Sequence, residues 1–215
     1  MNQIIPLYTW YNDLPTWEAR IATVQQNDLV VLDPNNGPPP PDQVSVIKDH
    51  IYQIRKRGGY VYGYVDTMYG DRRLEDVLEN ITAWARIGVD RIFFDQWKGT
   101  LRTTQYRIWL LTGALQQNMQ LTNKNPAYGP VAIFNPGVAC DYENVPARCL
   151  VVTYEGLRSD FPKKKWKSWE AALCYGGSEP VVGPEFAYVT ADTLPNPWDG
   201  IVASWSDPGA QWGNI

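Results

Sequence analysis

Histidine is nearly absent from this 215-residue chain, which contains only His50. A three-histidine zinc site therefore cannot form within one chain, and a Ser-His-Asp triad would have to use His50 itself. His50 falls between charged residues on a predicted helix, where we expect it to be solvated. No DxDxDG calcium loop is present either. We therefore expect neither a metal nor another cofactor.

Cysteines are also few: Cys140, Cys149 and Cys174 allow at most one internal disulfide. They form no CxxC pair, which argues against a zinc or thioredoxin-type site. We expect the three side chains to be buried as small apolar residues.

The chain lacks long apolar runs, a recognisable leader and an excess of basic residues. No run approaches the roughly 18 residues of a membrane helix, and the first residues have no basic n-region. A net charge of −4 and a pI near 5.0 argue against general nucleic-acid binding, which uses basic surfaces to neutralise phosphates. We expect no nucleic acid and no membrane partner, and a location in the cytoplasm, outside the cell by leaderless export, or in a virion.

Tryptophan and tyrosine are abundant, with 10 and 13 residues against only 5 phenylalanines. Both residues combine a flat apolar face with a hydrogen-bonding edge. Most of them are expected to pack in the core, but as a set they also suit a surface that stacks on sugar rings.

Strand-like and helix-like segments alternate along the chain, which at this length suits one domain, residues 1–215. The expected strands are 4–8, 29–32, 60–65, 91–94, 131–134, 150–152, 186–189 and 201–203. The expected helices are 14–24, 42–54, 74–84 and 103–118. This order predicts an α/β fold, a small (β/α)8 TIM-like barrel with irregular or missing helices in its second half. An open doubly wound sheet is disfavoured because no glycine-rich turn follows the first strand.

Four carboxylates lie at the carboxyl ends of predicted strands: Asp33, Asp66, Asp95 and Glu155. Strand ends of this kind meet at one mouth of a barrel. Glycoside cleavage needs two carboxyl groups there, one to donate a proton and one to attack or to activate water. Asp95 and Glu155 are the predicted catalytic pair. Asp33 and Asp66 have a second explanation, since a carboxylate at such a place often caps the next helix.

Amides and aromatic residues at the same strand ends are predicted to hold sugar hydroxyls and ring faces. The predicted substrate-binding residues are Tyr8, Asn35, Asp66, Thr67, Tyr69, Gln96, Asn135, Tyr188, Asp192 and Trp205.

Several short stretches resemble the spherulin-4 family (spherulation-specific family 4). They are Pro6–Tyr8, Asp33–Pro38, Gly63–Arg72, Ile92–Asp95, Phe134–Gly137, Val152–Glu155 and Leu194–Trp198. The resemblance implies a fold similar to (β/α)8 glycoside hydrolases. It also implies cleavage of α-1,4-linked N-acetylgalactosamine polymers, such as the galactosaminogalactan of fungal biofilms, with Asp95 and Glu155 at the catalytic positions.

The chain departs from the family pattern after the fourth strand, where the resemblance implies Asp-Glu and this sequence has Asp95-Gln96. Glutamine is neither a proton donor nor a carboxylate nucleophile. If Asp95 and Glu155 form the working pair, the protein is an active hydrolase of an amino-sugar polysaccharide. The alternative is a glycan-binding or structural protein on the same scaffold, for example a component of a phage virion. The short end after the last predicted strand also suggests that a second copy or an assembly partner covers that edge.

Overall fold

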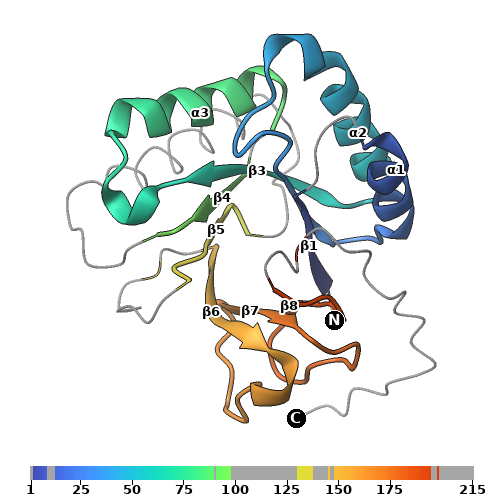
Figure 1. The fold of residues 1–215 in the computed structure, drawn as a ribbon, viewed down its shortest axis with the longest axis vertical. Helices are drawn as coiled ribbons and strands as arrows, with labels where there is room; N and C mark the ends of the chain where they lie inside the picture. Colours follow the sequence, from blue (N-terminus) through green and yellow to red (C-terminus); the bar gives the residue numbers. More distant parts are fainter. Residues whose placement is uncertain are drawn as a thin grey trace.

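Eight parallel strands pair in sequence order, and the last pairs with the first to close a barrel (Figure 1). The computed structural model describes residues 2–8, 13–89, 91–97, 130–137, 145, 148–194 and 198. The strands are β1 (Asn2–Leu7), β2 (Leu29–Leu32), β3 (Tyr60–Asp66), β4 (Ile92–Asp95), β5 (Ala132–Phe134), β6 (Cys149–Leu157), β7 (Glu170–Tyr175) and β8 (Phe186–Val189). The predicted TIM-like α/β barrel is confirmed.

Three α-helices follow the first three strands: α1 (Leu14–Thr23), α2 (Val44–Lys56) and α3 (Leu74–Arg86). Asp13 caps α1 by accepting a hydrogen bond from the Thr16 amide, and Pro15 stands in its first turn, where a missing N–H costs nothing. Three single 3-10 turns complete the described helical structure: η1 (Pro41–Gln43), η2 (Met68–Gly70) and η3 (Arg158–Asp160). The predicted helix 103–118 lies outside the described residues.

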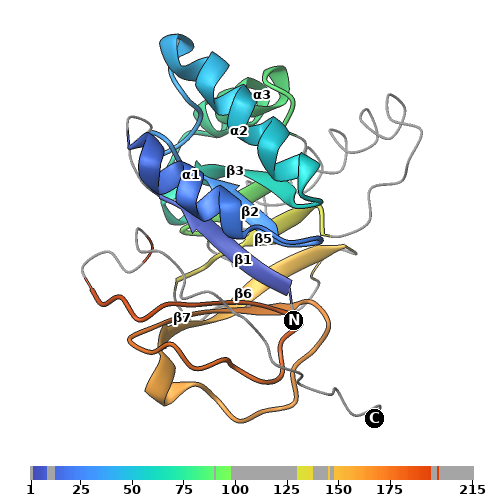
Figure 2. The same cartoon turned by 90° about the vertical axis from the view of Figure 1, so that its right-hand side faces the viewer.

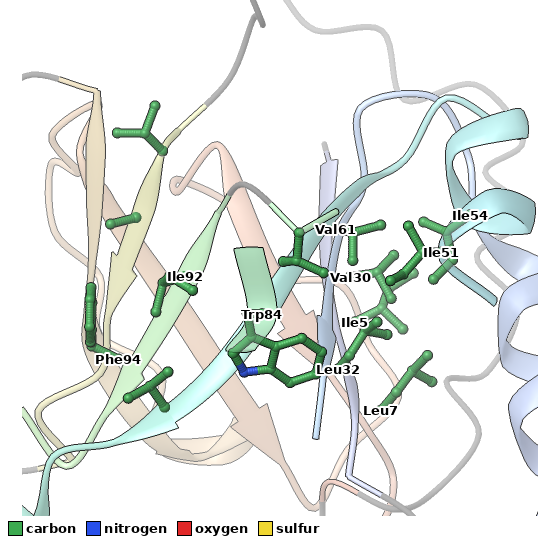
Figure 3. Packing of buried hydrophobic residues seen from close by; sticks show 14 of the residues in the cluster. Ile5, Leu7, Val30, Leu32, Ile51, Ile54, Val61, Trp84, Ile92 and Phe94 are labelled. Carbon is green, nitrogen blue, oxygen red and sulfur yellow. The ribbon is translucent and has the colours of Figure 1, made fainter. Parts of the chain in front are cut away.

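The helices pack their apolar faces on the outer side of the strands. Figure 3 shows Ile51 and Ile54 of α2 lying beside Val30 and Val61 of the sheet. Trp84 of α3 covers Gly63 of β3, where a Cβ atom would come within 2.4 Å of the indole. Glycine is therefore required at position 63, because any side chain there would push α3 away from the sheet.

The seventh strand corrects the sequence prediction. β7 is Glu170–Tyr175, and residues 186–189, predicted as the seventh strand, form the eighth. The predicted strand 201–203 lies outside the described residues. β7 contains Ala171, Ala172 and Leu173, which favour helices over strands, so its composition hides it. Its flanking strands on both sides hold it in the sheet.

Loops replace helices on the outside of the last two strands. The connections 158–169 and 176–185 are described throughout and contain no α-helix. Phe161, Trp166 and Val181 from these connections pack on the outward side chains of β7 and β8, such as Cys174. The prediction of missing helices in the second half is confirmed for these two connections.

Two smaller predictions have opposite outcomes. Cys149 and Cys174 are buried, as expected, and they are free, while Cys140 lies outside the described residues. His50, expected in solvent, is 8% exposed and stacks on Trp17 of α1 with ring centroids 4.9 Å apart. The charged neighbours in sequence misled the prediction because they lie on other sides of α2. Within the described ranges, no helix has the length and apolar character needed to cross a membrane.

Candidate active site

Strand alternation places the polar strand ends inside the barrel. The interior is filled by side chains such as Val31, Phe93 and Ile133, one from each of three strands. Because side chains two positions apart share a face, Asp33, Asp95 and Asn135 point the same way, toward the carboxyl-end mouth. These residues are the next inward positions above the apolar core.

Glu155 reaches the mouth only because β6 carries a bulge. Val152 pairs with Ala171, and Tyr154, two positions later, pairs with Ala172, so one extra residue is inserted at Thr153. Regular alternation from Val152 would turn Glu155 outward. The inserted residue reverses the alternation, and Glu155 pairs with Leu173, which faces the interior.

One amide joins the two predicted catalytic carboxylates. Asn135 Nδ2 donates to Asp95 Oδ1 at 2.8 Å and to Glu155 Oε2 at 2.9 Å. These two oxygens therefore lie no more than about 5.7 Å apart, the sum of the two distances. The Asn135 backbone is itself fixed, since its N–H donates to the Phe94 carbonyl and its carbonyl accepts from the Trp97 N–H.

Asp95 is the more strongly hydrogen-bonded of the two acids. Besides Asn135, the Tyr64 hydroxyl donates to Asp95 Oδ2 at 2.7 Å, and the Gln96 N–H also donates to its carboxylate. Burial raises the pKa of Asp95, and these three hydrogen bonds oppose the rise. The pKa of Tyr64 is raised by burial and by the charge on Asp95, so its phenol remains a donor.

Glu155 has fewer donors to stabilise its charged form. The residue as a whole is exposed at the end of β6, but its carboxyl group lies in the partly buried mouth against Asn135. Loss of hydration there raises the pKa of Glu155, Asn135 opposes the rise, and the charge on Asp95 adds to it. Among the described groups, Asp95 therefore has more hydrogen bonds that stabilise its charged form than Glu155 has.

Asp33 and Tyr8 complete the inner wall of the mouth. Asp33 Oδ1 accepts from the Gly37 N–H at 2.7 Å, and burial together with the charges on Asp95 and Asp66 raises the pKa of Asp33 to about 7. Tyr8 meets Tyr64 edge to face at 5.4 Å. Its own pKa is raised by burial and by the charge on Asp95, so both phenols face the carboxylates in their neutral form.

The loop after β3 braces the end of β4. The buried Thr67 hydroxyl donates to the carbonyls of Asp95 and Gln96, and the Tyr69 N–H donates to the Gln96 carbonyl at 2.7 Å. Met68, Tyr69 and Gln96 all have φ near +50°, a left-handed conformation that is costly outside glycine. These contacts hold the strained turn that directs the Gln96 N–H at Asp95.

Other predicted residues differ in their distance from this network. The Tyr69 hydroxyl lies beside Gly137 in the loop after β5, and loss of hydration and the charges on Asp95 and Glu155 raise the pKa of Tyr69. Asp66 pairs with Asp95 in the sheet and accepts from the Met68 N–H. The Thr67 hydroxyl donates to the backbone carbonyls of Asp95 and Gln96.

The remaining predicted residues lie apart from the network or outside the described residues. Asn35 is exposed in the loop after β2. Tyr188 is buried in the barrel interior, with its ring 5.6 Å from that of Trp198. Asp192 accepts from the Thr190 hydroxyl beyond β8. Trp205 lies outside the described residues.

Sequence reasoning missed Tyr64 as a site residue and the bulge at Thr153. The position of Tyr64, two residues before Asp66 on the same strand, was a usable signal because it shares the inward face. No pattern in the sequence signals the bulge. Among the described side chains, no three His, Cys, Asp or Glu residues are arranged to hold a metal ion.

Comparison with known proteins shows the family and the fold of this chain. The model of spherulation-specific family 4 matches residues 2–189. Spherulin-4 of Physarum polycephalum is 24% identical over 168 residues, which cover 77% of this chain and 48% of that protein. The chain thus spans about half the length of this curated relative.

A solved structure shares the fold. The crystal structure of Aspergillus clavatus Sph3 in complex with GalNAc superposes with a TM-score of 0.65 at 18% identity, covering 95% of this chain and 94% of that one. At this identity the likeness concerns the fold alone. The family match, which extends over most of the barrel, carries the assignment: this chain belongs to spherulation-specific family 4.

Proposed function

We propose that this protein is a glycoside hydrolase that acts on an amino-sugar polysaccharide of the α-1,4-linked N-acetylgalactosamine or galactosamine type. The observation that carries the proposal is the Asn135 amide, which binds Asp95 and Glu155 at once. Two carboxyl groups held at a fixed separation inside one barrel mouth are what cleavage of a glycosidic bond requires.

The separation favours a retaining mechanism. The two bridged oxygens lie at most about 5.7 Å apart, close to the roughly 5–5.5 Å of retaining enzymes and short of the roughly 6.5–9.5 Å of inverting ones. A water molecule needs the wider gap to attack from the face opposite the leaving group. In this site a carboxylate itself is the better-placed nucleophile.

The hydrogen bonds support an assignment of the two roles. Asp95, whose carboxylate accepts three hydrogen bonds that stabilise its charged form, attacks the anomeric carbon. Glu155, whose pKa is raised by burial and by the charge on Asp95, protonates the departing glycosidic oxygen. Glu155 then takes a proton from water, which attacks the anomeric carbon, and the bond to Asp95 breaks to restore its carboxylate.

The sugar class rests on the family and on charge. The fold relative Sph3 was crystallised in complex with GalNAc, which supports an amino sugar as the ligand. The gathering of four acidic side chains at the mouth, Asp33, Asp66, Asp95 and Glu155, suits a chain that carries some free amino groups. Binding of a partly deacetylated polymer is therefore expected to weaken as salt concentration rises.

Gln96 supports a second candidate, a glycan-binding protein on a hydrolase scaffold. It replaces the acid implied by the family resemblance, and the described hydrogen bonds at this position come from its backbone and not from its side chain. Its N–H donates to Asp95 and its carbonyl accepts from Thr67 and Tyr69. The Asp95–Glu155 pair is complete without a carboxylate at position 96, and this favours the hydrolase.

The test incubates the purified protein with α-1,4-linked N-acetylgalactosamine polymers, both intact and partly deacetylated. Released oligosaccharides are identified by mass spectrometry, and NMR of fresh products reports the anomeric configuration. Asp95→Asn and Glu155→Gln are the variants, Gln96→Glu is the restoring change, and Asp49→Asn on the exposed side of α2 is the control.

Products from the parent and the control, absent from both acid variants, are the expected result. Products with an inverted configuration would contradict the retaining mechanism while leaving the enzyme class intact. Products only after Gln96→Glu would favour the glycan-binding alternative. No products from any variant would contradict the proposed substrate class.

A further inference from the structure

A basic pocket lies on the outside of the barrel, apart from the carboxylate mouth. It has a volume of about 510 Å³ and lies between the two helix-free connections, with walls that include Arg158, Phe161, Lys163, Lys164, Lys165 and Val182. In Figures 1 and 2 the β6–β8 connections lie on the side of the molecule opposite to α2 and α3. No part of the proposed hydrolysis uses this pocket.

Positive charge is concentrated at this place. Residues 158–167 include five cationic side chains and one acidic one, Asp160, in a chain whose net charge is −4. Lys164 is neutralised, since its Nζ lies 2.6 Å from Glu170 Oε1. Lys163 and Lys165 are exposed, and neither has an ion pair with any described residue. Two ammonium groups are thus available to a ligand.

Arg158 adds a cation held in a fixed position. Its Nε donates to the Glu179 carbonyl at 2.8 Å and its Nη2 donates to the Pro180 carbonyl at 2.7 Å. Both partners are neutral carbonyls, so the guanidinium keeps its charge uncompensated at the pocket wall. Asp160 accepts a hydrogen bond from Ser159. The balance of charge in the pocket favours an anionic ligand.

The aromatic rings here are already covered, which limits the kind of ligand. The Phe161 ring stacks on the Trp166 ring with centroids 5.2 Å apart, and the Tyr154 ring meets Phe161 edge to face with centroids 5.4 Å apart. Lys164 lies over Trp166 at 4.3 Å from the ring centroid, and Arg158 lies 5.8 Å from that of Phe161. Recognition of single-stranded nucleic acid depends on open ring faces on which bases stack. Small charged groups on an extended chain fit this pocket better.

The pocket begins close to the proposed active site along the chain. Glu155 and Arg158 are three residues apart at the end of β6, which places their backbones about 10 Å apart in extended chain, at about 3.3 Å per residue. A polysaccharide that leaves the mouth over the end of β6 would therefore meet the cationic side chains within a short distance.

We propose that this pocket binds the carboxylate groups of an acidic polysaccharide, as a second glycan site beside the catalytic mouth. The choice of a polysaccharide over other polyanions rests on the proposed function. The site would keep the protein on a matrix that contains uronic acids while the mouth acts on amino sugars. Lysines at positions 163 and 165 supply the contacts, and Arg158 supplies the fixed charge.

The experiment measures the affinity of the full chain for α-1,4-linked polygalacturonate by isothermal titration calorimetry, at low and at high NaCl. Lys163→Gln/Lys165→Gln is compared with Lys48→Gln/Lys56→Gln, which removes two exposed lysines from α2. The pocket variant is expected to bind about tenfold more weakly, because each lost charge-assisted contact weakens binding. The control should retain the parent affinity, and high salt should weaken parent binding.

Two further arms separate this site from the active site and from nucleic acids. Polygalacturonate binding should persist in Glu155→Gln, and single-stranded DNA should bind more weakly than polygalacturonate. Equal losses in the two lysine pairs, no loss in either, or stronger binding of DNA would overturn the proposal. A failure to cleave the amino-sugar polymer would contradict the proposed function and leave this measurement unaffected.

Discussion

The two halves of the barrel cover their strands in different ways. Helices α1, α2 and α3 shield β1–β4 with a continuous apolar layer that includes the fully buried Trp84. Around β7 and β8 the same task falls to loop residues such as Phe161 and Trp166. The barrel closes in both cases, which shows that a parallel strand needs an apolar cover but not a helical one.

The two halves also contribute differently to the mouth. The first half supplies Asp33, Asp66 and Asp95 at the ends of three regular strands. The second half supplies Asn135 and, by way of an inserted residue, Glu155. The regular half thus gives acids by plain alternation, whereas the other half needs a local irregularity to complete the pair.

Deleting Thr153 tests that irregularity and should have the largest effect. Without the extra residue, regular alternation turns Glu155 away from Asn135 and out of the mouth. Turnover is expected to fall as far as in Glu155→Gln, by about 10²–10⁴-fold, the usual contribution of a general acid. Initial rates on the polymer substrate measure the loss.

Thr153→Ala is the matched control, because it keeps the inserted residue and changes only its side chain. It should retain most of the activity and melt cooperatively. If the deletion variant remained as active as Thr153→Ala, the bulge would have no part in positioning Glu155.

Replacing one tryptophan in each covering layer compares the two halves directly. Trp84→Ala empties a site that is 0% exposed and removes the indole hydrogen bond to the Tyr64 carbonyl. It should cost about 3–5 kcal/mol of the free energy of unfolding. Trp166→Ala removes a partly exposed ring and should cost about 1–2 kcal/mol. Urea unfolding of both variants gives the two values, and equal losses would mean that the loops stabilise the barrel as much as the helices do.

The same contrast explains what the sequence could predict. Periodic apolar residues, with Asp13 and Pro15 at the first helix, were enough for α1, α2 and α3. Apolar runs were enough to predict strands β1–β6. β7 escaped prediction because Ala171 and Ala172 carry no strand signal, and its place in the sheet comes from pairing with neighbours far along the chain.

The site was predictable to a similar extent. Asp95 and Asn135 followed from the rule that functional side chains gather at strand ends, and Glu155 joins them in one hydrogen-bonded network. The bulge that turns Glu155 inward depends on pairing with β7, the strand that the sequence did not reveal. Tyr64 was overlooked because only the residues at the strand ends were considered, and Tyr64 is the inward-facing residue two positions before the end of β3.

A pair of glycines provides a finer comparison of the two halves. A Cβ at Gly63 would lie 2.4 Å from the rigid, fully buried indole of Trp84. Gly63→Ala should therefore lower the free energy of unfolding by about 1–3 kcal/mol. At Gly177 the nearest atom is Arg158 Cγ at 2.8 Å, in a loop with no helix above it. Gly177→Ala should cost less than Gly63→Ala in chemical denaturation, and the reverse order would contradict the view that the loop layer is the more adaptable one.

The smallest expected effect concerns the acids supplied by the first half. Asp33 has a pKa of about 7 in the folded protein, raised by burial and by the charges on Asp95 and Asp66. Its ordinary value is about 3.9. The fold therefore favours the protonated acid, and this contribution to stability is complete below about pH 4 and is lost as the pH rises through about 7.

Asp33→Asn removes the titration but keeps an oxygen that can accept from the Gly37 N–H. The melting temperature of this variant should exceed that of the parent at pH 8 and match it near pH 4. Asp49→Asn, on the exposed side of α2, makes the same change in net charge and should give no such pH-dependent gap. A gap of equal size in both variants would trace the effect to overall charge, whereas a gap confined to Asp33→Asn would locate it in the crowded carboxylates that the regular half of the barrel brings to the mouth.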